Sequence, residues 1–198
     1  MTIMKPSVKS VGGRPRSFDR DAALEVAMRL FWRHGYEGVS FQHLTAEMGL
    51  APASLYAAFG NKASLYRETL DRYATLRGAS DLAFMDSCTG LRDAAQMLLE
   101  GTANGLVDPA GEIGCMLNTG MVTAHPDHAE LVEEVATRRR EFQKLLARRI
   151  ERWADTGRAE TLARYLAAVM QGMAVQARDG ASRDELLAIA REACARLD

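Results

Sequence analysis

Apolar side chains recur along most of this 198-residue chain at intervals of three and four residues, the spacing that places them on one face of an α-helix. Ala23, Ala27 and Phe31 form the first such face. Asp19 can cap the start of this helix and Gly35 can end it. No segment shows the period-two alternation, with β-branched residues, that is typical of a strand, so the chain is predicted to be all-α.

Two short helices and a longer one are predicted next. Ser40 is a good N-cap for the second helix, although His43 stands where a capping box needs Glu or Gln. Gly49 permits a tight turn, and Pro52 suits the first turn of the third helix because its missing N–H costs nothing there. The fourth helix is expected over 61–77. Five further helices are expected near residues 90–107, 112–123, 127–156, 159–178 and 182–197.

The charge is distributed unevenly along the chain. Residues 1–62 carry a net charge of +3 and the remainder −4, so a basic head precedes an acidic body. A basic head suits a polyanion such as DNA. We expect a flexible arm over 1–17, a basic three-helix domain over 18–62, and an acidic helical bundle over 63–198.

The second and third helices, with the glycine turn between them, form the minimal helix-turn-helix. Small residues at the exposed start of the third helix would let it approach base edges in the major groove. Tyr56 and Lys62 can each reach a phosphate. The predicted DNA-binding residues are Arg14, Arg16, Ser40, Phe41, Gln42, Ala51, Pro52, Ala53, Ser54, Tyr56 and Lys62.

The run from Phe18 to Leu65 resembles the DNA-binding domain of the tetracycline-repressor (TetR) family. The residues that carry the resemblance include Gly35 with Tyr36, Ala46, Gly49 with Leu50, Ser54-Leu55-Tyr56, Phe59 and Lys62. It implies a helix-turn-helix DNA-binding domain over 18–62 and an effector-binding and dimerisation domain over 63–198. It also implies a repressor that binds palindromic double-stranded operator DNA as a homodimer and is released by a small-molecule inducer. The third helix lacks Arg, Asn and Gln, so Gln42 and the arginines of the arm, Arg14 and Arg16, are the best candidates for base and minor-groove contacts.

Two further sets of residues are predicted in the second domain. A mostly apolar effector cavity is expected around Phe84, Met97, Leu98, Cys115, Met116, Met121, Phe142, Leu146 and Trp153. The last two helices carry small residues that permit close helix approach, and the resemblance implies that they pair with their copies. The predicted dimer interface comprises Leu166, Val169, Met170, Met173, Leu186, Ile189, Ala190 and Leu197. A ligand would tilt the fourth helix and change the spacing of the two recognition helices.

Several other functions are disfavoured. No motif for a metalloprotease, nucleophile elbow, P-loop or dinucleotide fold occurs, so neither an enzyme nor a cofactor is expected. Three well-separated cysteines and the absence of a signal peptide or membrane-length apolar run indicate the cytoplasm. Cys115 suits either a redox or electrophile sensor or a small buried side chain, and His125 with His128 is a weak candidate for metal binding. The arginine run 138–140 is expected to be a solvated face. Activation in place of repression stays open.

Overall fold

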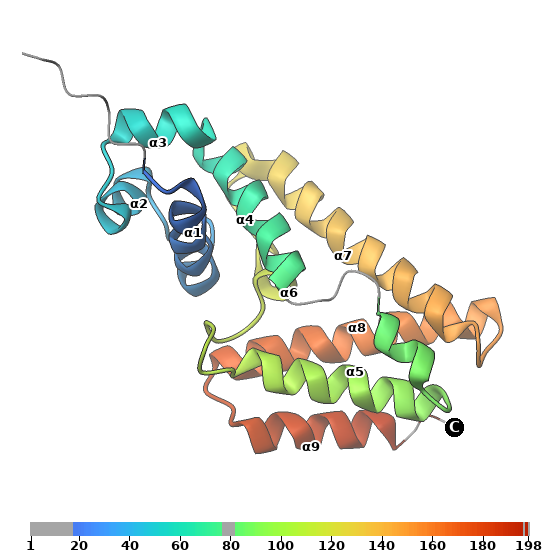
Figure 1. Cartoon of the computed structure of the whole chain (residues 1–198). Helices are drawn as coiled ribbons and strands as arrows, with labels where there is room; N and C mark the ends of the chain where they lie inside the picture. The colour runs from blue at the N-terminus through green and yellow to red at the C-terminus, as the bar shows by residue number, and fades with distance from the viewer. Residues whose placement is uncertain (1–17, 77–81, 196, 198) are drawn as a thin grey trace, which may run out of the picture.

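The computed structural model describes residues 18–76, 82–195 and 197 (Figure 1). The predicted arm 1–17, with Arg14 and Arg16, lies outside this part of the chain. The head consists of α1 (Arg20–His34), α2 (Phe41–Met48) and α3 (Pro52–Phe59), followed by α4 (Lys62–Leu76). The body contains the short 3-10 helices η1 (Ala83–Ser87) and η2 (Pro126–His128) and the helices α5 (Leu91–Leu106), α6 (Met116–Thr119), α7 (Ala129–Ile150), α8 (Thr156–Arg178) and α9 (Arg183–Cys194). The described residues include no strand, which confirms the all-α prediction.

The caps predicted for the head are present. The carboxylate of Asp19 accepts from the backbone N–H groups of Asp21 and Ala22, each at 3.0 Å. The Ser40 hydroxyl accepts from the N–H of His43 at 2.9 Å. Because a side-chain acceptor satisfies helix N–H groups that have no partner in the helix, these residues define where α1 and α2 begin.

Two buried cores hold the molecule together. One lies between α5, α8 and α9, which are stacked side by side in Figure 1, and includes the second half of α7. The other fills the head and continues through α4, where Leu65, Tyr66 and Leu70 are buried. Met116 from α6 and Leu131 from α7 also join this second core. The boundary expected after residue 62 therefore runs through a continuous core, and the head is packed directly on the body.

The helix predicted over 112–123 is wrong. The structure has only the four-residue α6 there, because glycines at 111, 114 and 120 surround it and Gly114 has a φ of +90° that a helix does not contain. The helix predicted over 127–156 is divided into η2 and the shorter α7. The helix predicted to begin at 159 begins at Thr156, because Asp155 accepts from the N–H of Arg158 and caps it.

None of the helices in the described part of the chain has the length and hydrophobicity that crossing a bilayer requires.

Candidate nucleic-acid interface and cavity

The turn between α2 and α3 sets the geometry of the helix-turn-helix. Gly49 follows α2 with a φ of 62° and ψ of 31°, a left-handed conformation that glycine adopts without a Cβ clash. The N–H of Leu50 then donates to the carbonyl of Thr45 at 3.0 Å and closes the end of α2. Pro52 occupies the first turn of α3, and no side chain caps that helix end. The start of α3 is thereby left open to an external acceptor.

The side chains predicted to contact DNA lie mostly on the outside of this motif. Those of Ser40, Gln42, Ala51, Pro52, Ala53 and Tyr56 are exposed, and those of Phe41 and Ser54 are half-buried. Tyr56 is 53% exposed although it is large and aromatic, and its ring stacks on Phe41 with centroids 4.0 Å apart. On the opposite side of α3, Leu55 and Phe59 are buried in the head core. Burial of these two residues orients the exposed face of α3 outward.

Lys62 lies at the start of α4, where its ammonium is 4.0 Å from the centroid of the Tyr36 ring. Burial lowers the pKa of Lys62, and the carboxylate of Glu37 acts in the opposite direction. The side chain is half-buried between these groups. A phosphate contact from Lys62 stays a prediction, and it would require the ammonium to reach out from this position.

The head is joined to the body by arginine side chains that the sequence did not single out. Arg33 at the end of α1 forms a two-bond ion pair with Glu112, both bonds at 2.8 Å. Arg67 of α4 forms a similar pair with Glu134 of α7 at 2.5 and 2.6 Å. Arg178, in the last turn of α8, donates to the carbonyls of Trp32 and Arg33. These pairs join residues more than 60 positions apart, so periodicity along the chain could not have found them.

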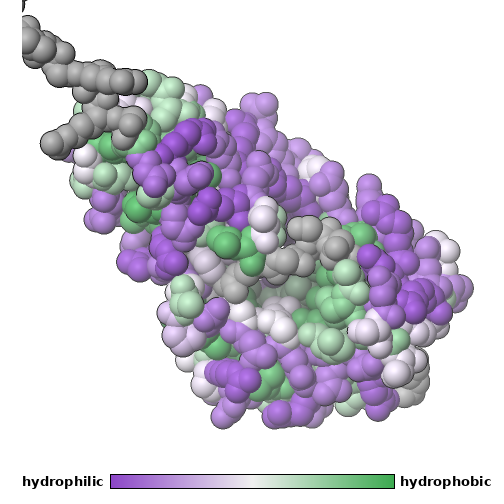
Figure 2. Space-filling view, in the orientation of Figure 1, coloured by the Kyte–Doolittle hydropathy of each residue, from purple (hydrophilic) through white to green (hydrophobic). Residues whose placement is uncertain are grey.

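A cavity of about 740 Å³ opens between α4, α5, α7 and α8. Figure 2 shows green, apolar residues gathered around a hollow between α7 and α5. Among the residues expected there, Phe84, Met97, Leu98, Cys115 and Phe142 line this cavity. Additional lining residues include Tyr73, Leu117, Asn118, Arg138, Arg139, Glu141, Leu145, Arg148, Met170 and Gln171.

Four residues expected around the cavity lie elsewhere. Met116 and Met121 point into the core of the head, because α6 presents one side to that core and the other side to the cavity. Leu146 is fully buried in the body core. Trp153 packs against the same core, and the Arg152 guanidinium lies 5.1 Å from its ring centroid. Helical spacing identified these residues as apolar and buried, but it could not say which interior they fill.

The arginine run 138–140 is not a uniformly solvated face. Arg138 pairs with Asp71 of α4 at 2.7 Å, and Arg140 is exposed and pairs with Glu133. Arg139 is half-buried and donates from Nη1 to the carbonyls of Leu117 at 3.0 Å and Gly120 at 2.9 Å. Three successive helix positions therefore serve three different purposes.

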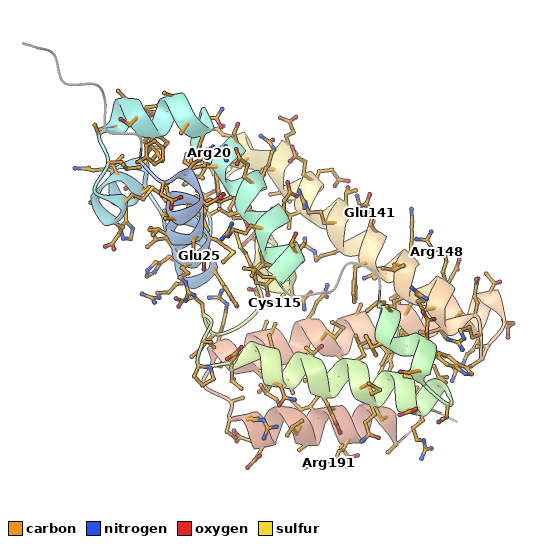
Figure 3. All side chains as sticks on the ribbon, viewed as in Figure 1. Arg20, Glu25, Cys115, Glu141, Arg148 and Arg191 are labelled. Atoms are coloured by element: carbon orange, nitrogen blue, oxygen red, sulfur yellow. The ribbon has the colours of Figure 1, made fainter. Side chains whose placement is uncertain are left out.

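Cys115 caps α6, where its sulfur accepts from the N–H of Asn118 at 3.4 Å. Its thiol is free and half-buried, and Figure 3 places it where head and body meet. His125 and His128 are near one another, with ring centroids 6.4 Å apart. No cluster of three metal-binding side chains occurs among the residues that the structure describes.

The predicted dimer interface needs correction. Leu166, Met173, Leu186, Ala190 and Leu197 are at most 3% exposed, because α8 and α9 pack these side chains against each other and against α5 within one protomer. They have no surface left for a second copy. Met170 lines the cavity, whereas Val169 and Ile189 lie in a shallow surface depression with Tyr165, Ala188 and Glu192.

Comparison with known proteins was made for both sequence and structure. Residues 23–69 match the profile of bacterial regulatory proteins of the tetR family. The HTH-type transcriptional repressor ComR of Escherichia coli (strain K12) is 35% identical over 191 residues, covering 92% of this chain and 90% of ComR. The repressor BdcR of the same organism is 30% identical over 184 residues, covering 91% of this chain and 89% of BdcR. The TetR-family regulator CifR, in a cysteine mutant complexed with operator DNA, superposes with a TM-score of 0.85 and 35% identity, covering 93% of this chain and 99% of that chain.

Proposed function

The chain belongs to the tetR family of bacterial regulatory proteins, and from this premise we propose that it is a repressor that binds palindromic operator DNA as a homodimer and is released by a small-molecule inducer. Regulators of this family are DNA-binding proteins and not enzymes. The cytoplasm is the compartment in which such a protein meets both its operator and its inducer.

The observation that carries the proposal is the exposed face of α2 and α3. Ser40, Gln42 and Tyr56 project from this face, and Ala51, Pro52 and Ala53 keep the start of α3 free of bulk. A helix end without bulky side chains can enter the major groove, and hydroxyl groups beside it can bind phosphates. CifR, whose fold is closely similar to that of this chain, is seen in complex with its operator DNA. We therefore assign operator binding to this face.

The dimer would form on the outer sides of α8 and α9. Tyr165 and Val175 of α8 are 39% and 51% exposed, and Val169 and Ile189 add apolar surface at the shallow depression between the helices. Two copies related by a two-fold axis would bury these side chains against each other. The same axis would place the two α3 helices about one DNA turn apart, roughly 34–36 Å, for binding in consecutive major grooves.

Release would begin in the cavity. An inducer there touches α4 through Tyr73 and Ala74, and α4 continues the core of the head. An inducer that binds better to a state with displaced heads shifts the population away from DNA.

Operator binding is tested by fluorescence anisotropy with duplex DNA from upstream of the gene for this protein. We expect saturable binding whose affinity falls steeply with salt, since phosphate contacts release counterions. Tyr56→Phe keeps the stack on Phe41 and removes one hydroxyl, so it should weaken binding about fivefold, the effect of about 1 kcal/mol. Ser87→Ala removes one exposed hydroxyl from η1, outside the surfaces proposed for DNA and for the dimer, and should leave the affinity unchanged. A flat salt dependence, or equal affinities for both variants and the natural chain, would contradict this assignment.

A further inference from the structure

The cavity has an apolar wall and a cationic side, and this combination restricts what it can bind. Phe84, Met97, Leu98, Phe142, Leu145 and Met170 contribute apolar surface from four different elements. Within the described ranges, all the charged lining residues come from α7 and comprise three arginines, Arg138, Arg139 and Arg148, and one acid, Glu141. Glu141 and Arg148 follow one another along α7 in Figure 3. The lining therefore carries an excess of positive charge.

These arginines differ in how far their charge is already neutralised. Arg138 is paired with Asp71 at 2.7 Å. Arg148 is exposed and forms no ion pair with a residue in the described ranges. Arg139 is half-buried, and its only hydrogen-bond partners within the described chain are two neutral carbonyls. No described residue thus serves as a counter-ion to Arg139 at the cavity wall.

The hydrogen-bonding pattern of Arg139 leaves a defined edge free. Both bonds to the carbonyls of Leu117 and Gly120 are donated by Nη1, and no described residue accepts from Nε or Nη2. No buried side-chain nitrogen or oxygen in the described ranges lacks a partner, so this free edge is open to solvent and not sealed in the core. Nε and Nη2 are the two donors that bind both oxygens of a carboxylate. Burial lowers the pKa of Arg139, but an arginine stays charged at neutral pH.

We propose that the cavity binds an amphipathic organic carboxylate, with its acid group on the Nε–Nη2 edge of Arg139 and its apolar body among the aromatic, leucine and methionine side chains. This inference deepens the proposed function, because it names the chemical class of the inducer. A neutral ligand would leave the positive charge of Arg139 uncompensated. A cation would be repelled, since Glu141 is the only acid facing three arginines among the described lining residues.

The same guanidinium links the cavity to the head. Arg139 holds the carbonyls at the end of α6, and Met116 of that helix is buried in the head core. Gly120 lies so close to α4 that an added Cβ would be 2.9 Å from the Tyr66 hydroxyl. An acid group that draws Arg139 toward the cavity therefore shifts α6 against α4, which is the physical route from ligand to DNA-binding domain.

The test is direct titration calorimetry of the full-length chain in the absence of DNA. The probes are two matched series that differ only in the polar group: octanoate, octanol and octylamine, and phenylbutanoate, phenylbutanol and phenylbutylamine. We expect each carboxylate to bind at least about tenfold more tightly than its alcohol, the effect of one charge-assisted pair, and each amine to bind most weakly. Equal affinity for carboxylate and alcohol, or no binding by any carboxylate, would overturn the proposal.

Variants identify the residue responsible. Arg139→Gln should reduce the preference for carboxylate over alcohol to less than about threefold while the alcohol affinity is kept. Arg140→Gln is the matched control, because Arg140 is exposed on the same helix, pairs with Glu133 and does not line the cavity, and it should keep the full preference. If Arg139→Gln does not fold, Arg139→Lys takes its place. This variant keeps the charge but not the two-donor edge, so it should lose part of the preference for carboxylate over alcohol. Full preference in the folded Arg139 variants would refute the role of this residue.

The two proposals fail separately. A chain that binds carboxylates but no duplex DNA retains this inference and refutes the proposed repressor function. A chain that binds duplex DNA but prefers alcohols or amines refutes this inference and retains the proposed repressor function.

Discussion

Arg178 connects the last turn of α8 with the last turn of α1, and it is the contact whose loss we expect to be most informative. Its Nη1 donates to the carbonyl of Arg33 at 3.3 Å and its Nη2 to the carbonyl of Trp32. Carbonyls in the last turn of a helix have no partner within the helix, and a cation there also interacts favourably with the helix dipole. This clamp arginine therefore fixes the head to the helix on which we propose the dimer forms.

The magnitude follows from these contacts. A hydrogen bond from a charged donor contributes about 1.5–3 kcal/mol when buried, and a cation at a helix C-terminus about 0.3–1 kcal/mol. Arg178 is exposed, so solvent screening reduces both contributions. We expect Arg178→Ala to lower the free energy of local opening at the end of α1 by about 1–2 kcal/mol, which corresponds to roughly 5- to 30-fold in the opening equilibrium.

Amide hydrogen exchange measures this opening locally. Exchange should accelerate by that factor for amides of residues 29–35, and less or not at all for α5 and α9 in the other core. Arg178→Lys keeps the charge but donates less favourably to two carbonyls, so its effect should be intermediate. Arg164→Ala, an exposed arginine elsewhere on α8, is the matched control and should change nothing in α1. Exchange in α1 that stays within twofold of the natural chain after Arg178→Ala would refute the reasoning.

Four further predictions concern stability. Gly101→Ala, in the middle of α5 with nothing within 4 Å of the new Cβ, should raise the free energy of unfolding in urea by about 0.5–1 kcal/mol. Gly114→Ala should lower the free energy of unfolding by more than about 1 kcal/mol, because φ is +90° and the new Cβ would lie 2.9 Å from the Nε of Arg178. An increase in the free energy of unfolding would contradict the backbone argument. Burial raises the pKa of Tyr66 from 10.0 to about 12, so the folded chain keeps a proton that the unfolded chain loses. Stability should therefore fall as pH rises above about 10. Burial also raises the pKa of Tyr36, so absorbance titration should show late-ionising tyrosines, and Tyr66→Phe should remove the step near pH 12. The hydrogen bond from Arg67 lowers the pKa of Glu134, so this pair stabilises the fold at neutral pH and its contribution is lost as pH falls through the lowered value. Glu134→Gln should cost up to about 1 kcal/mol in urea unfolding near neutral pH, and this cost should shrink as pH falls below the ordinary glutamate range; the same cost at every pH would argue against the ion pair.

The sequence alone was sufficient for the helices of the head and for its outward face. Asp19 and Ser40 were identified as caps because a short acceptor side chain before an apolar helical pattern can accept a hydrogen bond from the free N–H groups of the first turn. Leu55 and Phe59 are both buried because residues four apart share a helix face, and Tyr56 lies on the exposed side. Gly49 was identified as the turn because its conformation is one that other residues rarely adopt.

Long-range packing accounts for what periodicity missed. Met116, Leu166 and Met173 were recognised as apolar, but an apolar stripe faces a cavity, a second copy or its own core with the same spacing. The ion pairs of Arg33 and Arg67 and the role of Arg139 depend on partners far along the chain. From the sequence alone, a charged residue in a run is therefore expected to be exposed to solvent, because its partner is not known.

Local chemistry in this chain was determined by the sequence itself: helix starts, the glycine turn, the direction of each apolar face and the resemblance to TetR-family heads are all encoded within a few neighbouring residues. The tertiary structure alone decided which apolar residues line the cavity, which face of α8 and α9 stays outside, and which arginine of α7 reaches the carbonyls of Leu117 and Gly120. The physical reason is the distance along the chain over which each interaction acts. Backbone propensity and capping act over one helical turn, whereas cavities and ion pairs arise where segments remote in sequence are brought into contact by burial of their apolar faces.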